Sequence, residues 1–184
     1  MNTDPLFPID HLIIRPIGPD DAQLLHRLVE QDRARLARYF PVTTARTTDP
    51  KAAQAYVRDL LASAAARESM AFLIHIDGSS GPVGLLFLKS FDHQVRKCEL
   101  AYFVSNAHAG KGIATAAVAW AVDEAFRGHG LQRIFLRIDP NNHASIRVAE
   151  KNGFQREGLL RSDFRTPDDE LLDVIVFGKL SSQP

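Results

Sequence analysis

A short loop with two glycines, "HAGKG" at residues 108–112, stands directly before the alanine-rich helical run "IATAAVAWAV". The start of a helix exposes unpaired backbone N–H groups and the positive end of the helix dipole, and both stabilise an anion. Gly110 and Gly112 lack side chains that would keep an anion at a distance. Lys111 adds a positive charge, and Thr115 places a hydroxyl in the first helical turn. The pattern predicts a pyrophosphate-binding site; the alternative is a flexible connector with glycines at its turns.

The spacing of this loop matches neither the glycine fingerprint of dinucleotide-binding folds nor the lysine-ended phosphate loop of nucleotide hydrolases. The segment "ELAYFVSNAHAGKGIAT" (99–115) instead resembles the fourth strand and acetyl-CoA-binding signature of the GNAT superfamily of N-acetyltransferases. That signature, Gln/Arg-x-x-Gly-x-Gly/Ala, falls on residues 109–114, with Ala109 in place of the usual Arg or Gln. The substitution removes one side-chain donor, for which His108 or Lys111 can compensate.

Further segments extend the resemblance over nearly the whole chain. "NNHASIRVAEKNGFQREG" (141–158) is similar to the Asn-x-x-Ser…Glu-Lys-x-Gly-Phe-x-x-Glu-Gly segment of many GNAT members. "LIIRPIGPDDAQLL" (12–25) and "RYFP" (38–41) resemble the RimJ/RimL-type branch, which includes enzymes that acetylate the N-termini of ribosomal proteins. The middle and C-terminal motifs are specific in combination, whereas the N-terminal match is looser.

The resemblance implies that an acetyl group passes directly from acetyl-CoA to a primary amine, without a covalent enzyme intermediate. It also implies that backbone N–H groups at residues 102–104, where the fourth strand splays from the fifth, polarise the thioester carbonyl and pair with the pantetheine arm. The cofactor-binding residues expected from the loop and the resemblance are Tyr102, Phe103, Val104, Gly110, Lys111, Gly112, Ile113, Ala114, Thr115, Asn142 and Ser145.

Three side chains are candidates for the proton transfers of this reaction. Ser145 occupies the position of the family's serine that protonates the leaving thiolate, and its alternative role is capping the helix start. Glu99, in the fourth strand, is a candidate general base whose pKa burial would raise; the alternative is a partly exposed partner of Arg or Lys. Asp163 is the rival base. Deprotonation through water with no dominant base is a third alternative.

The acceptor amine is less closely defined than the cofactor. The resemblance favours the N-terminal amine of a protein or peptide, such as a ribosomal protein. The alternatives are a small amine, such as a polyamine, an amino acid or an aminoglycoside, and a catalytically silent module that binds acyl-CoA. A homodimer is also expected from the family.

Composition excludes several other classes of protein. The chain has 184 residues, enough for one domain (1–184, with a core over 11–180), and 22 basic residues balance 22 acidic ones. This neutral charge gives no support to a nucleic acid or an anionic membrane as partner. Cys98 is the only cysteine and the seven histidines lack ligand spacing, so we predict no disulfide and no metal site. Without a signal peptide or a long apolar run, we expect a soluble, cytoplasmic protein.

The elements that position these residues follow from hydrophobic periodicity. Strands are predicted at 11–17, 70–77, 83–91, 98–104, 131–139, 154–164 and 171–180. An amphipathic helix or a broken pair is predicted over 18–40, ended by Pro41, and helices are predicted from Pro50 to Ala66, from 112 to Arg127 and within 141–153. The order predicts an α/β (α+β) fold of GNAT type, with a mixed, mostly antiparallel sheet of six to seven strands flanked by helices. The segment 97–138 is long enough for a parallel crossover.

Overall fold

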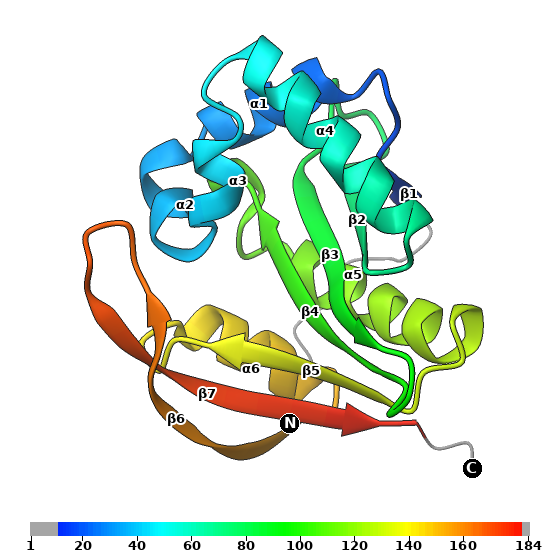
Figure 1. Ribbon diagram of the computed structural model, residues 1–184, viewed down its shortest axis with the longest axis vertical. Helices are drawn as coiled ribbons and strands as arrows, with labels where there is room; N and C mark the ends of the chain where they lie inside the picture. The colour runs from blue at the N-terminus through cyan, green and yellow to red at the C-terminus, as the bar shows by residue number, and fades with distance from the viewer. Residues whose placement is uncertain (1–10, 182–184) are drawn as a thin grey trace.

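The computed structural model describes residues 11–181 and contains one seven-stranded sheet in the order β1-β2-β3-β4-β5-β7-β6 (Figure 1). All neighbouring strands are antiparallel except β4 and β5, which are parallel. The predicted mixed, mostly antiparallel sheet is therefore confirmed. The strands are β1 (Leu12–Pro16), β2 (Ser69–Ile76), β3 (Gly84–Asp92), β4 (Lys97–Val104), β5 (Arg133–Ile138), β6 (Gln155–Arg165) and β7 (Leu171–Leu180).

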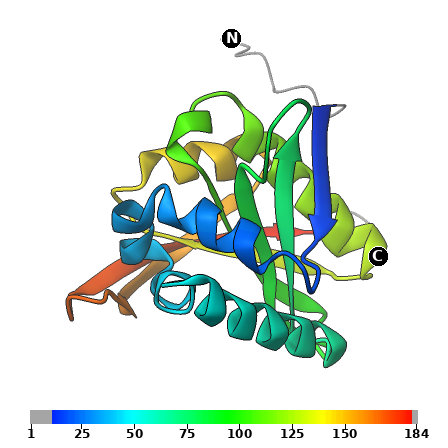
Figure 2. The same ribbon diagram turned by 90° about the horizontal axis from the view of Figure 1, so that it is seen from above.

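Helices cover both faces of this sheet (Figure 2). Because successive side chains of a strand point to opposite faces, β4 contributes Leu100 to one core and Phe103 to the other. One core packs α1 (Ala22–Glu30), α2 (Arg33–Tyr39) and α4 (Pro50–Ala65) on the sheet. The other packs α5 (Ile113–Asp123), its π-helical continuation η3 (Glu124–Gly128) and α6 (His143–Lys151).

The N-terminal helical region adopts the broken arrangement that was one of the two sequence alternatives. α1 ends at Glu30 and α2 ends at Tyr39, where Pro41 begins the short α3 (Pro41–Ala45). Proline suits the first turn of a helix, because its missing N–H would have no partner there. The predicted helix from Pro50 is observed, and the Asp49 carboxylate caps it by accepting from the Ala52 N–H at 2.8 Å.

Asp21 stands at the N-cap position of α1 but does not cap it with its side chain. Its carboxylate accepts from both terminal nitrogens of Arg15, at 2.6 and 2.7 Å, and from the Gly18 N–H at 2.6 Å. The hydrogen bonds from Arg15 hold the pKa of Asp21 below its usual value, although burial opposes this. Within the N-terminal motif "IRPIGPDD", this two-point hydrogen bond between Arg15 and Asp21 therefore links the end of β1 to the start of α1.

The sheet opens between its two parallel strands. β4 and β5 are paired only at Lys97–Arg133, Cys98–Ile134 and Glu99–Phe135. Beyond Glu99, β4 continues along β3 as far as Val104, while β5 continues along β7 as far as Ile138. The strands therefore diverge as the resemblance implied, and the free edge of β4 faces a wedge in which the candidate site lies.

None of the helices within residues 11–181 is long and apolar enough to cross a membrane.

Candidate active site

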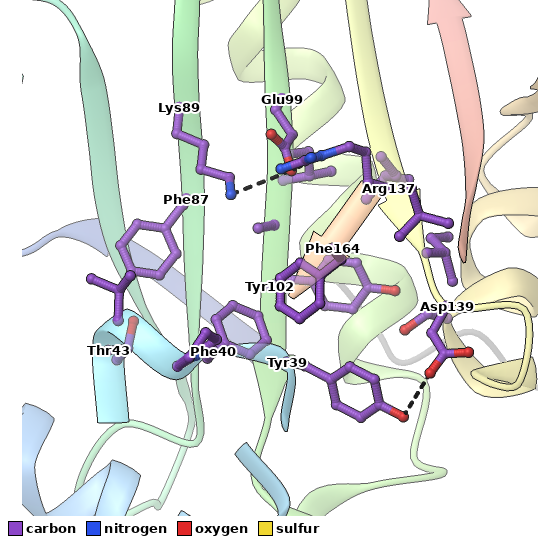
Figure 3. Close-up of a pocket in the computed structure, with 18 of the residues that line it drawn as sticks. Tyr39, Phe40, Thr43, Phe87, Lys89, Glu99, Tyr102, Arg137, Asp139 and Phe164 are labelled. Atoms are coloured by element: carbon purple, nitrogen blue, oxygen red, sulfur yellow. Dashed lines mark hydrogen bonds and ion pairs between the residues drawn. The ribbon is translucent and has the colours of Figure 1, made fainter. Parts of the chain in front are cut away.

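Two cavities meet in the wedge between β4 and β5. The first, which we call the cofactor cavity, has a volume of about 860 Å³ and is bounded by the end of β4, the 108–112 loop and the starts of α5 and α6. The second, which we call the acceptor cavity, has a volume of about 380 Å³ and lies among the helices α2, α3 and α4 and the strands β2 to β7 (Figure 3). The residues that line both cavities are Tyr39, Phe40, Tyr102, Asn142 and Ser145.

The structure brings together every residue predicted to bind the cofactor. The strand residues Tyr102 to Val104, the loop and helix-start residues Gly110 to Thr115, and Asn142 and Ser145 of α6 all line the cofactor cavity. The rest of α5 and β5 separate Asn142 and Ser145 in the sequence from the other residues, and the divergence of β4 from β5 places them all around one space.

The backbone of the loop explains the need for both glycines. Gly110 has φ +74° and Gly112, the N-cap residue of α5, has φ +81°. Residues with a β-carbon rarely adopt such angles, so glycine is required by conformation. The first backbone bond of α5 runs from the Ala116 N–H to the Gly112 carbonyl, and the N–H groups before it lack partners within the helix. They are at the cavity wall.

Basic side chains line the same cavity as these N–H groups. Arg35, Lys111, Arg147 and Lys151 line the cofactor cavity. His108 also lines it, but its Nδ1 is 2.8 Å from the Ser105 hydroxyl. The positive charges and helix start together suit an anion with several charges, such as a diphosphate. The Lys111 ammonium donates to the Ala107 carbonyl at 3.0 Å, so both side chains that could compensate for the Arg or Gln that Ala109 replaces already have a hydrogen-bond partner near the loop.

The start of α6 separates the roles of its two polar side chains. The Asn142 carboxamide oxygen accepts from the Ser145 backbone N–H at 3.1 Å and so provides the cap. The Ser145 hydroxyl is not needed for that cap and lies in the wall shared by the two cavities. Tyr102 lies in the same wall. Burial raises the pKa of Tyr102 to about 12, with the nearby Ser145 opposing, and the Tyr102 hydroxyl forms no hydrogen bond of good geometry in the described structure.

The two candidate bases belong to one cluster of charges. The Glu99 carboxylate is buried and lies 3.2 Å from Arg137 Nε and 3.3 Å from Lys89 Nζ. Asp163 accepts from Arg137 Nη1 at 2.9 Å. Burial lowers the pKa of Arg137, but Glu99 and Asp163 more than offset this effect, so the net pKa is raised. Glu99 thus has the Arg and Lys partners of its alternative interpretation. It lines the acceptor cavity, whereas Asp163 lines neither cavity.

Sequence reasoning missed a second polar group, at the junction of the cavities. The Asp139 carboxylate follows β5, is buried, and accepts from the Tyr39 hydroxyl at 3.4 Å and the Asn141 N–H at 2.8 Å. Arg38 Nε is 3.9 Å from Asp139, but Arg38 Nη1 donates to Glu170 at the shorter distance of 2.9 Å. The available signal was an acidic residue at the end of a predicted strand, three positions before Asn142.

Cys98 lies outside this site. Burial raises the pKa of the Cys98 thiol to about 12, so Cys98 behaves as a small buried hydrophobe. Residues 11–181 contain no group of three or more His, Cys, Asp or Glu side chains arranged to hold a metal ion.

Comparisons with known proteins agree with this geometry. A family model described as the acetyltransferase (GNAT) domain matches residues 11–155. The N-acetyltransferase p20 of Bacillus licheniformis is 31% identical over 112 residues, 61% of this chain and 62% of that protein, so the match spans less than two thirds of p20. The spermidine N(1)-acetyltransferase of Escherichia coli K12 is 29% identical over 82% of this chain and 76% of that enzyme. Mycobacterium smegmatis RimJ, solved with CoA-disulfide, has a TM-score of 0.84 and 26% identity, covering 94% of this chain and 83% of RimJ.

Proposed function

Since the chain belongs to the GNAT acetyltransferase family, we propose that it moves an acetyl group from acetyl-CoA to a primary amine, above all the N-terminal α-amine of a protein or peptide. The observation that carries this proposal is the common wall of the two cavities, formed by Tyr39, Phe40, Tyr102, Asn142 and Ser145. Because the two cavities share these residues, a donor in one and an acceptor in the other would lie next to each other, as direct transfer in a ternary complex requires.

The residues of the cofactor cavity fit acetyl-CoA. The diphosphate would bind the free N–H groups at the start of α5, with Lys111 and the neighbouring basic side chains balancing its charge. The pantetheine arm would lie along the edge of β4 that β5 leaves unpaired beyond Glu99. At the end of that edge, the Val104 carbonyl already accepts from Arg35 at 2.9 Å, which ties α2 to this wall.

Ser145 is the proposed acid. The amine nitrogen attacks the thioester carbon, the carbon–sulfur bond breaks, and the thiolate that leaves takes a proton. The Ser145 hydroxyl would give that proton; this role is supported by the cap, which uses the Ser145 backbone N–H and not the hydroxyl. Backbone N–H groups of residues 102–104 would stabilise the charge that develops on the carbonyl oxygen.

Glu99 is the proposed base, acting through water. An α-amine titrates near ~8 and arrives largely protonated at neutral pH. Glu99 lines the acceptor cavity, and Asp163, which lines neither cavity, would act only by holding Arg137. The Glu99 carboxylate also contacts Lys89 and Arg137, so it is not turned toward the cavity alone. Water-mediated deprotonation with no dominant base therefore stays the alternative.

An acceptor screen tests the proposed function. We expect free CoA to be released from acetyl-CoA in the presence of peptides with a free N-terminus and not in the presence of the same peptides with a blocked N-terminus. Binding of CoA without release of thiol by any amine would instead support a non-catalytic acyl-CoA-binding module. The expected homodimer is a separate prediction, which sedimentation can check.

A further inference from the structure

The walls of the acceptor cavity are mainly apolar. Its volume of about 380 Å³ falls in the range of about 300–1,000 Å³ that is usual for ligand pockets. Aromatic and aliphatic side chains from five strands (β3 to β7), α4 and the α2–α3 segment line it, among them Phe40, Phe87, Leu100, Leu136, Phe164 and Val174. Figure 3 shows the Phe164 ring between two separate polar groups, one with Lys89, Glu99 and Arg137 and the other with Tyr39 and Asp139, and the rings of Phe40 and Phe87 beside them. A ligand that fills this cavity must therefore present apolar surface.

The polar group that is farther from the cofactor cavity is electrically balanced. Lys89 and Arg137 contact Glu99, and Arg137 also contacts Asp163. Two positive and two negative side chains thus neutralise one another. A further ammonium group at this end would meet Lys89 and Arg137 without a free carboxylate to pair with, which is unfavourable in a buried site.

The polar group at the junction of the two cavities is centred on Asp139, whose carboxylate can pair with one more positive charge. Asp139 is tied to the shared wall, because the Tyr39 hydroxyl donates to it at 3.4 Å and the Asn142 N–H donates to its carbonyl at 2.8 Å. Its cationic neighbour Arg38 is 3.9 Å away and already pairs with Glu170. The Asp139 carboxylate therefore keeps capacity for an ammonium group next to the point of transfer.

We infer that the acceptor is a monoamine with a large apolar group beside its single ammonium: Asp139 holds the ammonium, the apolar group lies against the apolar walls of the cavity, and the proton passes through water along the cavity to Glu99. This inference rests on the proposed function. An N-terminal residue with an aromatic or large aliphatic side chain has this chemistry, and so does an arylalkylamine. A polyamine does not, because its additional ammonium groups would lie against apolar walls or against Lys89 and Arg137.

Peptides that differ only in their first residue, together with two small amines, test this inference. We expect kcat/KM for a peptide beginning with Phe or Leu to exceed that for the same peptide beginning with Ser by about tenfold or more. We expect phenethylamine to be a better acceptor than spermidine. The comparison of peptides and the comparison of small amines together show whether the apolar group belongs to a peptide or to a small amine. Preference for Ser or for spermidine would overturn the inference.

A cavity-filling variant gives a second test. Ala101 of β4 lines the acceptor cavity, so Ala101→Leu should reduce the Phe-to-Ser ratio of kcat/KM by about tenfold or more. The matched control is Ala62→Leu, on an exposed position of α4 outside both cavities, which should leave the ratio unchanged. Asp139→Asn should raise KM for all acceptors. An unchanged ratio in Ala101→Leu would contradict the proposed place of the apolar group.

Calorimetry separates this inference from the proposed function. Phenethylamine and spermidine are titrated into the full chain saturated with CoA. Binding of phenethylamine but not spermidine, without any acetyl transfer, would support the inference while overturning the proposed function. Tighter binding of spermidine, or no binding of phenethylamine, would overturn the inference even if acetyl transfer to other amines is found.

Discussion

The two cavities that meet in the wedge are built from different parts of the chain. The features of the cofactor cavity that suit the cofactor include several of the backbone: a helix start, two glycines with positive φ and an unpaired strand edge. The acceptor cavity is formed by side chains from segments far apart, held by ion pairs and aromatic contacts. Backbone donors can bind the diphosphate and pantetheine groups that every CoA ester shares. Side chains, in contrast, can be replaced one at a time by mutation, and each replacement can change which acceptor fits. The difference indicates that the reaction is fixed by the fold, and the substrate by the surface of the acceptor cavity.

Removing the shared hydroxyl should have the largest effect on catalysis. Ser145→Ala deletes the proposed acid at the junction, and we expect kcat to fall about 100-fold or more. CoA affinity and the free energy of unfolding should change little, because the cap bond uses the Ser145 backbone N–H, which the variant keeps. The check is steady-state kinetics with calorimetry on the same protein. An unchanged kcat would show that Ser145 has no role in proton transfer.

A change of the loop backbone should weaken the cofactor side alone. Gly112→Val places a β-branched residue at φ +81°, a conformation that costs about 1–3 kcal/mol. We expect the Kd for CoA to rise by about fivefold to 100-fold, measured by calorimetry. Gly158→Ala is the control, since Gly158 has no neighbour within 4 Å of an added β-carbon and lines neither cavity. Equal affinities of the two variants would remove the proposed role of the loop.

The two carboxylates that contact Arg137 should differ in their effects. Glu99→Gln removes the proposed base from the acceptor cavity, and we expect kcat to fall about tenfold or more. Asp163→Asn should have a smaller effect, because Asp163 lies outside the cavity. Kinetics on the pair decide between them. A larger loss in Asp163→Asn would reverse the assignment, and no loss in either would favour deprotonation by water.

A change remote from both cavities should alter stability without altering activity. Arg15 lowers the pKa of Asp21 in the folded state, so the pair stabilises the fold above the unfolded-state pKa of about 3.9. This stabilisation is lost as the pH falls through the lower folded-state pKa. Asp21→Asn should therefore reduce the free energy of unfolding at pH 7 by about 1–3 kcal/mol, and by less in strong acid. Urea unfolding at both pH values measures this. Equal losses at both would contradict the ionic explanation.

The residues that sequence alone singled out for the cofactor lie around one cavity, and they could be found because their signals are local. The loop, helix start and capping asparagine each lie within a few residues, and the resemblance to the GNAT superfamily and its RimJ/RimL-type branch, which linked them, is confirmed. The acceptor side depends on contacts between distant residues, such as Tyr39 with Asp139 and Arg38 with Glu170. No pattern within a short stretch of sequence predicts contacts between residues so far apart. The ion pairs of Glu99 were foreseen only as one alternative, because the partners Lys89 and Arg137 come from neighbouring strands whose register the sequence does not state.

The most direct test of the central claim is the initial velocity of CoA release when acetyl-CoA and a peptide amine are varied together. Direct transfer between the two adjoining cavities requires both substrates to be bound at once. Plots of reciprocal velocity against reciprocal substrate concentration should therefore give intersecting lines. Parallel lines would indicate an acetylated enzyme intermediate. That result, or no release of CoA with any amine, would contradict the account.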